Sequence, residues 1–346
     1  MIRTVVVGYG LAGRAFHCPL IARQADLKLA GIVARDPQVR ASAEADWNVR
    51  GYADIAEALS DDSVQLVVIA TPHDTHADLA VRTLEAGKDC VVDKVMALGT
   101  EAADRMIAAR DASGKMLSVF HNRRWDWDYL TLRDVLARGA IGRAMVVESS
   151  VCRYAPPRTW RGQAASAGSI LHDWGAHLVD QALMLGFGPC RRLKAWLTPA
   201  LWPGVDTGGH GQIVMEFDEV VFRIETSRIA RATHPRWWVL GSRGGFQKDG
   251  IDPQEDALRT GDIDRASEPS EHQAVVNAED EQGNSRESRI DTVRGHWDGY
   301  YANIAEHLLE RVPLIVTAEQ GREVVRVLEA ADHSAANRVV VEGPWG

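Results

Sequence analysis

Strand-like and helical patterns alternate along the first 120 residues. Short, continuously apolar runs predict strands that are buried on both faces. Alanine-rich stretches between them carry apolar side chains at helical spacing. This alternation predicts parallel strands with helices on both sides of the sheet. The predicted strands are residues 4–7, 27–33, 66–70, 90–92 and 116–120, and the predicted helices include 74–86 and 101–111.

The pattern changes after about residue 121. Strand-like segments now follow one another without helices between them, which favours an antiparallel or mixed sheet. A helical patch at 169–185 is the exception. With 346 residues, the chain is expected to form two domains, 1–120 and 121–346. The predicted strands of the second part are residues 144–154, 193–197, 211–217, 220–227 and 237–241.

The last hundred residues combine an irregular stretch with two helices. Residues 248–294 are polar, acidic and poor in periodicity, and we expect a long surface insertion, a lid or an oligomer contact. Residues 300–310 are amphipathic. The segment Thr317-Ala318-Glu319-Gln320 fits a capping box that opens a last helix through about residue 334.

Composition and charge narrow the function classes. A hydrophobic content of 45% predicts a sizeable core, and a net charge of −9 argues against binding to nucleic acid phosphates or anionic lipid. No apolar run is long enough for a membrane span. The 4 cysteines show no CxxC spacing, which is typical of reduced thiols in a cytoplasmic protein.

A glycine-rich turn follows the first predicted strand. Gly8, Gly10 and Gly13, with Leu11 and Ala12 between them, match G-x-G-x-x-G in the strand–turn–helix context that strengthens this motif. The first glycine permits a tight turn, the second lets backbone N–H groups approach a pyrophosphate, and the third permits close helix–strand packing. The turn predicts a dinucleotide cofactor.

The end of the second predicted strand bears on which dinucleotide binds. NAD sites usually place an acidic residue there for the ribose hydroxyls. Here Ala34 occupies that place and Arg35 follows, and an arginine can pair bidentately with a 2′-phosphate. We therefore predict NADP. The alternative is that Asp36 binds the ribose, which would allow NAD.

An acid and a base lie four residues apart far downstream. Asp173 and His177 fall within the predicted helical patch, so the spacing places both on one helix face. Histidine has a reference pKa near that of a base working at neutral pH, about 6.5. With a dinucleotide turn in the same chain, the pair suggests hydride chemistry.

Further motifs make the chain resemble one family. In order along the sequence they are Thr71-Pro72-His73-Asp74-Thr75-His76, Val91-Val92-Asp93-Lys94-Val95, His121-Asn122-Arg123-Arg124-Trp125-Asp126, and the Asp173 to His177 segment. This succession resembles the glucose–fructose oxidoreductase and inositol dehydrogenase (Gfo/Idh/MocA) family over essentially the whole chain. Phe16-His17, residues 120–126, Tyr154 and residues 250–255 are most similar to its NADP-dependent scyllo-inositol dehydrogenases.

The resemblance implies a fold and a set of roles. It implies an N-terminal Rossmann domain and a C-terminal α/β domain whose large open sheet commonly forms a homodimer or homotetramer interface. By the same resemblance Thr71, Pro72 and His76 line the cofactor, Asn122 and Arg123 border nicotinamide and substrate, and Tyr154 contacts the substrate. Lys94 takes the catalytic lysine position, and Asp173 and His177 complete the catalytic set.

The chain departs from the family at one motif. The family usually has Glu-Lys-Pro where this sequence has Asp93-Lys94-Val95. Proline supports a cis peptide bond that is rare before other residues, so either the turn is trans here or its neighbours hold the cis form. His73 and His76 have a spacing that permits metal binding, but no third ligand is near, and we predict no metal site.

These residues suit the oxidation of an alcohol. We assign His177 as the base for the hydroxyl proton and Lys94 as the cation that stabilises charge on the oxygen. Trp160 is one of several tryptophans near the motifs whose faces can stack on a sugar or cyclitol. The prediction is an NADP-dependent dehydrogenase or reductase for a polyol, inositol or sugar. Two alternatives are redox-assisted elimination or glycoside cleavage with a retained cofactor, and a non-enzymatic NADP-sensing protein.

Overall fold

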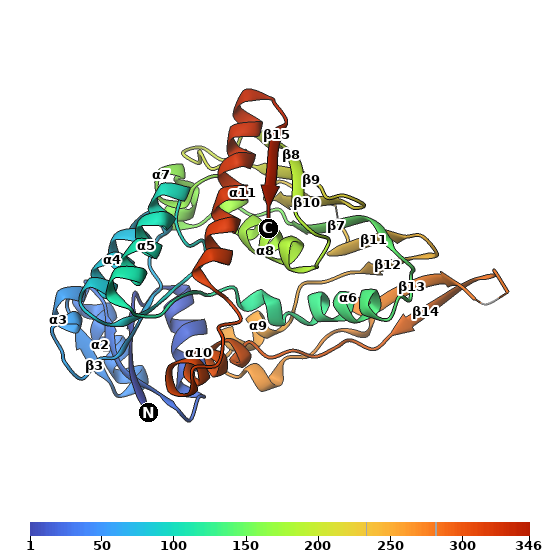
Figure 1. The fold of residues 1–346 in the computed structure, drawn as a ribbon. Coiled ribbons are helices and arrows are strands. Elements are labelled where there is room, and N and C mark those ends of the chain that lie inside the picture. Colours follow the sequence, from blue (N-terminus) through green and yellow to red (C-terminus); the bar gives the residue numbers. More distant parts are fainter. Residues whose placement is uncertain (233, 281) are drawn as a thin grey trace. The chain divides into compact units, whose positions relative to one another are not determined.

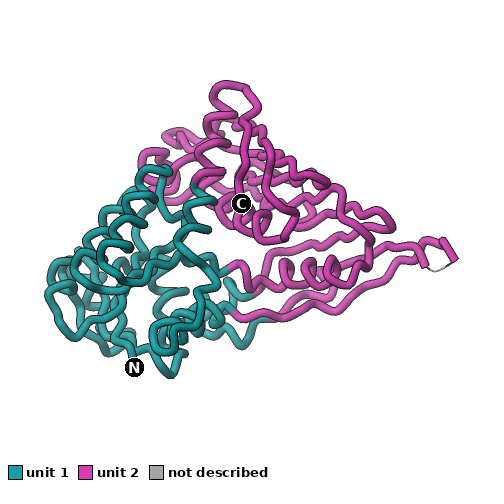
Figure 2. Tube along the Cα trace, in the orientation of Figure 1, with its two compact units in different colours: residues 1–122, 254–266, 297–325 teal, residues 123–253, 267–296, 326–346 magenta. Residues whose placement is uncertain are grey.

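The chain forms two compact units, which Figure 2 distinguishes by colour. The computed structural model describes residues 1–232, 234–280 and 282–346. The first unit contains residues 1–122, 254–266 and 297–325, and the second contains residues 123–253, 267–296 and 326–346. The chain therefore crosses between the units several times, and the first unit includes segments from the last hundred residues.

The first unit is built on a six-stranded parallel sheet. Its strand order, β3-β2-β1-β4-β5-β6, is the order of a Rossmann fold, which confirms the predicted fold class. Val5 and Val6 on β1 and Val67 and Val68 on β4 are fully buried, as continuous apolar runs predict. The strands are β1 (Ile2–Val7), β2 (Leu27–Val33), β3 (Arg50–Tyr52), β4 (Leu66–Ile69), β5 (Asp89–Val92) and β6 (Leu117–Val119).

Helices of this unit begin where side chains cap them. Asp36 accepts hydrogen bonds from the first backbone N–H groups of α2, and Asp54 does so for α3. Thr317 and Gln320 exchange the two hydrogen bonds of a capping box, which confirms that prediction. The helices are α1 (Cys18–Ala22), α2 (Pro37–Trp47), α3 (Ile55–Leu59), α4 (His76–Glu85), α5 (Thr100–Ser113), α9 (Gln254–Arg259), α10 (Asp298–Glu310) and α11 (Ala318–Asn337), whose last turns belong to the second unit.

The second unit is built on a nine-stranded mixed sheet (Figure 1), as predicted. Its order is β14-β13-β12-β11-β7-β10-β9-β8-β15, and only β7 and β10 run parallel. Along β9, Ile213 and Met215 are buried and alternate with partly exposed residues, so one face of the sheet packs and the other is open. The strands are β7 (Ala144–Cys152), β8 (Cys190–Thr198), β9 (His210–Glu216), β10 (Val221–Ser227), β11 (Trp237–Gly241), β12 (Gly244–Lys248), β13 (Ala274–Glu279), β14 (Ser285–Ile290) and β15 (Val341–Trp345).

The packed face of this sheet carries α8, which lies against β7 and β10. Eight of the eleven residues of α8 are buried, and they include the polar residues His177, Asp180 and Gln181. The helices of this unit are α6 (Trp127–Ala137), α7 (Ala164–Ala167) and α8 (Trp174–Met184), with short 3₁₀ turns that include Asn122–Trp125, Thr159–Gly162 and Ile170–His172.

The structure corrects the predicted organisation at three places. The expected irregular insertion at 248–294 contains α9 and the hairpin β13–β14, which extends the sheet. Helix α6 and strand β15 were not predicted. Strand β14 is polar on both faces, so its hydrogen-bonded partner and not its apolar pattern places it in the sheet. Within the described residues, no helix is long and apolar enough to span a membrane.

Candidate functional site

The glycine turn has the close contacts that its motif requires. Gly8 has φ +100°, and a Cβ there would lie 2.5 Å from the carbonyl oxygen of Ala70. A Cβ on Gly13 would overlap the carbonyl oxygen of Gly8. Nothing lies within 4 Å of a Cβ built on Gly10. The turn thus packs tightly at its first and third glycines and leaves open space at the second, which fits a pyrophosphate at that point.

The helix after the turn carries Leu11 and Ala12 at its start. Helical residues run from 11 to 22, with a π-helical segment at Gly13–His17. Such segments are frequent at functional sites. The N-terminus of this helix, which is the positive end of the helix dipole, lies at the glycine turn. A helix N-terminus stabilises a bound anion.

The Thr-Pro loop lies directly beside the glycine turn. The Thr71 side-chain methyl is 3.2 Å from a Cβ placed on Gly8, and its hydroxyl is hydrogen-bonded to that of Thr75 at 2.6 Å. Pro72 has extended ψ and its carbonyl accepts a hydrogen bond from the Thr75 hydroxyl. The two motifs, 60 residues apart in sequence, therefore meet at the carboxyl ends of β1 and β4.

His76 joins this loop to the lysine motif. Its Nδ1 lies 2.8 Å from the carbonyl oxygen of Val95 and its Nε2 lies 2.9 Å from that of Thr71. Burial lowers the pKa of His76, although Asp93 opposes that shift. Both carbonyl oxygens accept, so either ring nitrogen can donate to its neighbour. His76 fixes the two loops against each other.

Lys94 is half-buried, and neighbours hold its backbone. Its N–H donates to the Asp93 carboxylate at 2.8 Å, and the Lys94–Val95 peptide bond is cis, one of the two alternatives considered from the sequence. The second Asp93 oxygen lies 3.8 Å from Nε2 of His17, whose Nδ1 is 2.7 Å from the Tyr301 hydroxyl. Burial acts to raise the pKa of Asp93, but His17 and the positive charge of Lys94 outweigh it and hold that pKa well below its usual range. A carboxylate thus lies at the base of the lysine turn.

The end of β2 separates the roles of Arg35 and Asp36. The Asp36 carboxylate accepts from the N–H of Gln38 at 2.8 Å, as the N-cap of α2. Arg35 is exposed. Arg40, one turn into α2, donates to the Ala34 carbonyl at 2.8 Å and adds a second guanidinium at this strand end. The Asp36 carboxylate is thus hydrogen-bonded to the backbone of α2, while the Arg35 side chain is exposed to solvent.

His177 lies in the first turns of α8, in the second unit. Its side chain is buried, with 6% exposure, and its ring lies 5.8 Å from the ring of Trp174. The Arg123 guanidinium lies 4.0 Å above the Trp174 ring and is paired with Asp126 at 3.1 Å. An imidazole, an indole and a guanidinium are therefore gathered at the start of one buried helix.

Asp173 does not lie within the helix, contrary to what its spacing from His177 predicts. It precedes α8 as the N-cap residue, with ψ −87°, and does not lie inside a continuous helix with His177. Its carboxylate pairs with the Arg228 guanidinium at 2.6 Å. Burial lowers the pKa of Arg228, and the charge of Asp173 opposes the shift. The Arg228 guanidinium therefore holds the Asp173 carboxylate in one position, and this ion pair also fixes the position of the second Asp173 oxygen.

A small pocket of the second unit contains this ion pair. Arg153, Asp173, Trp174 and Arg228 are among its lining residues. The lining also includes Thr226, which is 2% exposed and whose hydroxyl has no hydrogen-bond partner among the described residues. Buried polar groups usually have a hydrogen-bond partner, so this hydroxyl can bond to a water molecule or to a polar group that enters the pocket.

The other predicted site residues are divided between the two units: Asn122 belongs to the first, and Tyr154 and Trp160 belong to the second. Asn122 is buried at the end of the first unit's main segment. Tyr154 is 40% exposed and has the Arg231 guanidinium 3.6 Å above its ring. Trp160 is partly exposed and has the Arg161 guanidinium above its ring at 4.5 Å. Neither Tyr154 nor Trp160 is among the residues that line the pocket of Asp173 and Arg228.

Sequence reasoning missed Arg228 and Thr226 as site residues. Both lie at the end of β10, beside Arg153 at the end of β7, because these two strands are parallel and paired in register. The only sequence signal was an arginine directly after a buried strand. Without knowledge of the strand order, that signal does not distinguish Arg228 from other arginines.

Comparison with known proteins identifies the family. The profile of the oxidoreductase family with an NAD-binding Rossmann fold matches residues 2–121, and the GFO/IDH/MocA C-terminal domain matches residues 129–247. The chain belongs to the GFO/IDH/MocA family. It is 34% identical to the uncharacterized oxidoreductase YdgJ of Escherichia coli (strain K12), covering 98% of each chain. The family consists of oxidoreductases, and this chain is therefore an oxidoreductase.

Two further comparisons are with Bacillus subtilis. The chain is 30% identical to scyllo-inositol 2-dehydrogenase (NADP(+)) IolW of strain 168, over 97% of this chain and 94% of that protein. The solved structure of yvaA has a TM-score of 0.92 at 29% identity, covering 99% of this chain and 98% of that one. The similarity extends through both units and is not confined to the nucleotide-binding part.

Proposed function

We propose that this oxidoreductase uses NADP to interconvert a carbinol and a carbonyl group of a polyol, inositol or sugar. The observation that carries the proposal is a glycine turn with open space at Gly10, in a chain 30% identical along 97% of its length to a scyllo-inositol dehydrogenase that uses NADP. The ion pair of Asp173 with Arg228, beside the Thr226 hydroxyl, supports a substrate rich in hydroxyl groups.

The cofactor would be held by the first unit. The turn at Gly8, Gly10 and Gly13, with Leu11 and Ala12 at the helix start, would bind the pyrophosphate, and Thr71 and Pro72 would line the nicotinamide side. The bound nicotinamide supplies or accepts the hydride. Asn122 at the end of this unit completes the proposed lining.

The protein's own residues would handle the proton and the charge. In the oxidising direction His177 accepts the hydroxyl proton of the substrate, and the Lys94 ammonium stabilises the negative charge that grows on that oxygen. Asp173, fixed by Arg228, accepts a hydrogen bond from a neighbouring substrate hydroxyl. Arg123, Tyr154 and Trp160 are proposed as further substrate contacts, Arg123 because it is held on Trp174 by a contact of 4.0 Å.

A panel of inositols, aldoses and small carbonyl compounds tests the proposal. Each compound is assayed in both directions with NADP(H), followed by the absorbance of the reduced cofactor, and we expect turnover with at least one cyclitol or sugar. No turnover with any hydroxyl-rich compound would contradict the substrate class. A cofactor that co-purifies and shows no net redox change while a substrate is cleaved would instead support elimination or glycoside cleavage with a retained cofactor.

Arg35→Ala should lower kcat/KM for NADPH by at least about tenfold and leave that for NADH nearly unchanged, because a charge-assisted pair to the 2′-phosphate is lost. The comparison is steady-state kinetics with both cofactors. Arg105→Ala is the matched control, since Arg105 is an exposed arginine of the same unit paired with Asp78. An unchanged NADPH to NADH ratio in Arg35→Ala would mean that another group recognises the 2′-phosphate or that the enzyme prefers NAD.

The proposal also covers the oligomeric state and the cellular location of the enzyme. Assembly as a homodimer or homotetramer would use the open face of the nine-stranded sheet, where Trp196 and Leu240 are 44% and 41% exposed. Residence in the cytoplasm is proposed because all four cysteines are free.

A further inference from the structure

Three potential metal ligands converge on the open face of the nine-stranded sheet. Glu148 on β7 and Glu225 on the neighbouring parallel strand β10 lie on the same face, because Glu225 pairs with Ser150. His234 comes from the connection between β10 and β11. Its Nε2 lies 3.2 Å from a Glu148 oxygen and 3.9 Å from a Glu225 oxygen, and one ligand atom from each residue lies within 4.8 Å of the others. Both carboxylates are largely buried, with 14% and 18% exposure.

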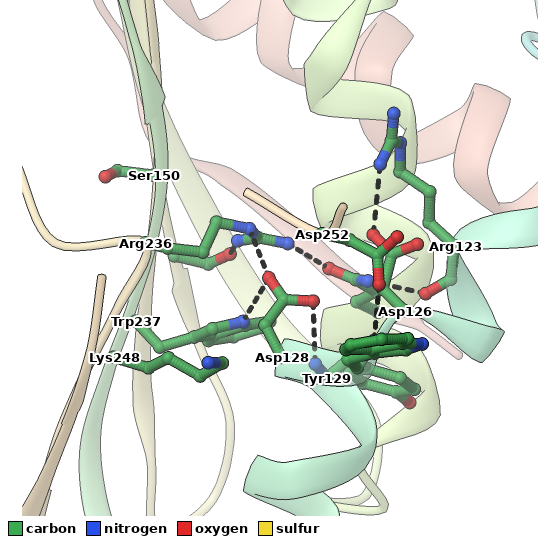
Figure 3. A network of polar contacts seen from close by, with 12 residues as sticks. Arg123, Asp126, Asp128, Tyr129, Ser150, Arg236, Trp237, Lys248 and Asp252 are labelled. Carbon is green, nitrogen blue, oxygen red and sulfur yellow. Dashed lines mark hydrogen bonds and ion pairs between the residues drawn. The ribbon is translucent and has the colours of Figure 1, made fainter. Parts of the chain in front are cut away.

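The hydrogen bonds of Ser150 assign the tautomer of His234. The Ser150 hydroxyl donates its only proton to the Pro235 carbonyl at 2.5 Å, so its oxygen accepts from Nδ1 of His234 at 2.9 Å. In the neutral ring the proton is then on Nδ1, and the lone pair of Nε2 points at two carboxylates. Figure 3 shows that Ser150 points to the side of the sheet away from Arg236 and its buried partners.

The cluster places one ring nitrogen and two carboxylate oxygens within 4.8 Å of one another, where a single metal ion can contact all three. Metal-binding histidines characteristically donate their other ring N–H to an oxygen, which fixes the ring as Ser150 does here. Nitrogen and oxygen ligands of a tetrahedral zinc ion, at about 2.0–2.1 Å, lie about 3.3 Å apart. The 3.2 Å between His234 and Glu148 is close to this spacing, and the 3.9 Å between His234 and Glu225 would shorten when an ion binds.

We propose that Glu148, Glu225 and His234 form a binding site for a divalent transition-metal ion of the zinc class. An imidazole with two carboxylates favours such an ion over magnesium or calcium, which prefer oxygen ligands alone. His210, whose Nδ1 is 3.7 Å from a Glu225 oxygen, or a water molecule would supply the fourth ligand. The site departs from the expectation that the chain binds no metal, which considered only His73 and His76.

Two other described polar groups contact the carboxylates of the cluster. The Arg223 guanidinium lies 3.8 Å from the second Glu148 oxygen and is 45% exposed, so it balances part of the charge from the solvent side. Cys152 donates its S–H to Glu225. A bound ion would tie the connection that leads into β11 to β7 and β10, and would therefore stabilise the sheet where Arg236 enters the core.

Zinc titration of the full-length protein tests the site. After dialysis against a chelator and removal of the chelator, zinc binding is measured by competition with a chromophoric chelator and by calorimetry. We expect one zinc per chain at the tightest site and a thermal unfolding midpoint that rises with zinc. His234→Ala and Glu148→Gln should each weaken that site by at least about tenfold and remove the zinc-dependent rise.

Matched variants separate this site from other surface groups. His333→Ala removes an exposed histidine of the same unit that contacts Asn337, and Glu216→Gln removes a carboxylate of the same sheet that is paired with Arg192. Both should bind zinc like the unchanged protein. Equal zinc binding by His234→Ala and the unchanged protein would overturn the proposal and identify the cation at His234 as a proton. Glu225→Gln provides a third ligand variant if another fails to fold.

Discussion

Lys94→Met should lower kcat by at least about 10²-fold, because the proposed stabilisation of charge on the substrate oxygen is lost while the side chain keeps its length. The backbone around Lys94 should survive the change, since the Asp93 carboxylate accepts from its N–H and His76 contacts the Val95 carbonyl. The measurement is steady-state turnover with the substrate found in the panel. Lys28→Met, at an exposed position on β2, is the control.

His177→Ala should cause a loss of at least about 10²-fold for a different reason, because a positioned base is removed. If His177 is that base, the fall in kcat/KM at low pH should also disappear in the variant. His333→Ala serves as the control for a histidine lost from the same unit. Turnover close to that of the unchanged enzyme in both Lys94→Met and His177→Ala would overturn the catalytic assignment, whereas a loss in only one would identify which group acts.

The parts of the fold that sequence predicts well are those with local signals. Strand β2 coincides with the predicted range 27–33, and the capping box at Thr317 begins α11 where expected. The glycine turn is also recognised from a local motif, although its close contact to Ala70 involves a distant part of the chain. Apolar runs and caps act within a few residues, so they can be identified without knowing what packs against them.

The parts that sequence predicts poorly depend on distant partners. Strand β14 has exposed residues on both faces and is a strand because β13 pairs with it. Asp173 was expected inside a helix, but α8 starts after it and Arg228, 55 residues away, determines where its carboxylate points. The strand order brings these residues together, and no local pattern around either one encodes it.

The same holds for a buried polar network beneath the sheet of the second unit (Figure 3). Arg236 is 2% exposed, and its Nε lies 2.7 Å from the Asp128 carboxylate. Its other nitrogens donate to Ser149 and, at 2.8 Å, to Gln181. Burial lowers the pKa of Arg236, and the Asp128 charge opposes the shift. Gln181 in turn donates to the Arg123 carbonyl at 2.8 Å, so the network extends to the backbone of a proposed substrate contact.

Asp128→Asn should lower the free energy of unfolding by about 3–5 kcal/mol, because it leaves the Arg236 guanidinium buried without its counter-ion. Asparagine keeps the shape of the side chain, so the loss reports charge and not a cavity. The measurement is urea unfolding followed by tryptophan fluorescence, to which Trp237 contributes, whose indole N–H donates to Asp128 at 3.1 Å.

Two further variants decide what the network contributes. Asp134→Asn on the same helix, whose partner Arg138 is 73% exposed, should cost less than about 1 kcal/mol, as exposed pairs do. The double variant Asp128→Leu with Arg236→Met should recover much of the lost stability, since removing both charges leaves neither one unpaired. If Asp128→Asn instead costs no more than Asp134→Asn, the Arg236 charge is compensated by Ser149, Gln181 and the further charges of Asp126 and Asp252, and the Asp128 carboxylate is not its essential partner.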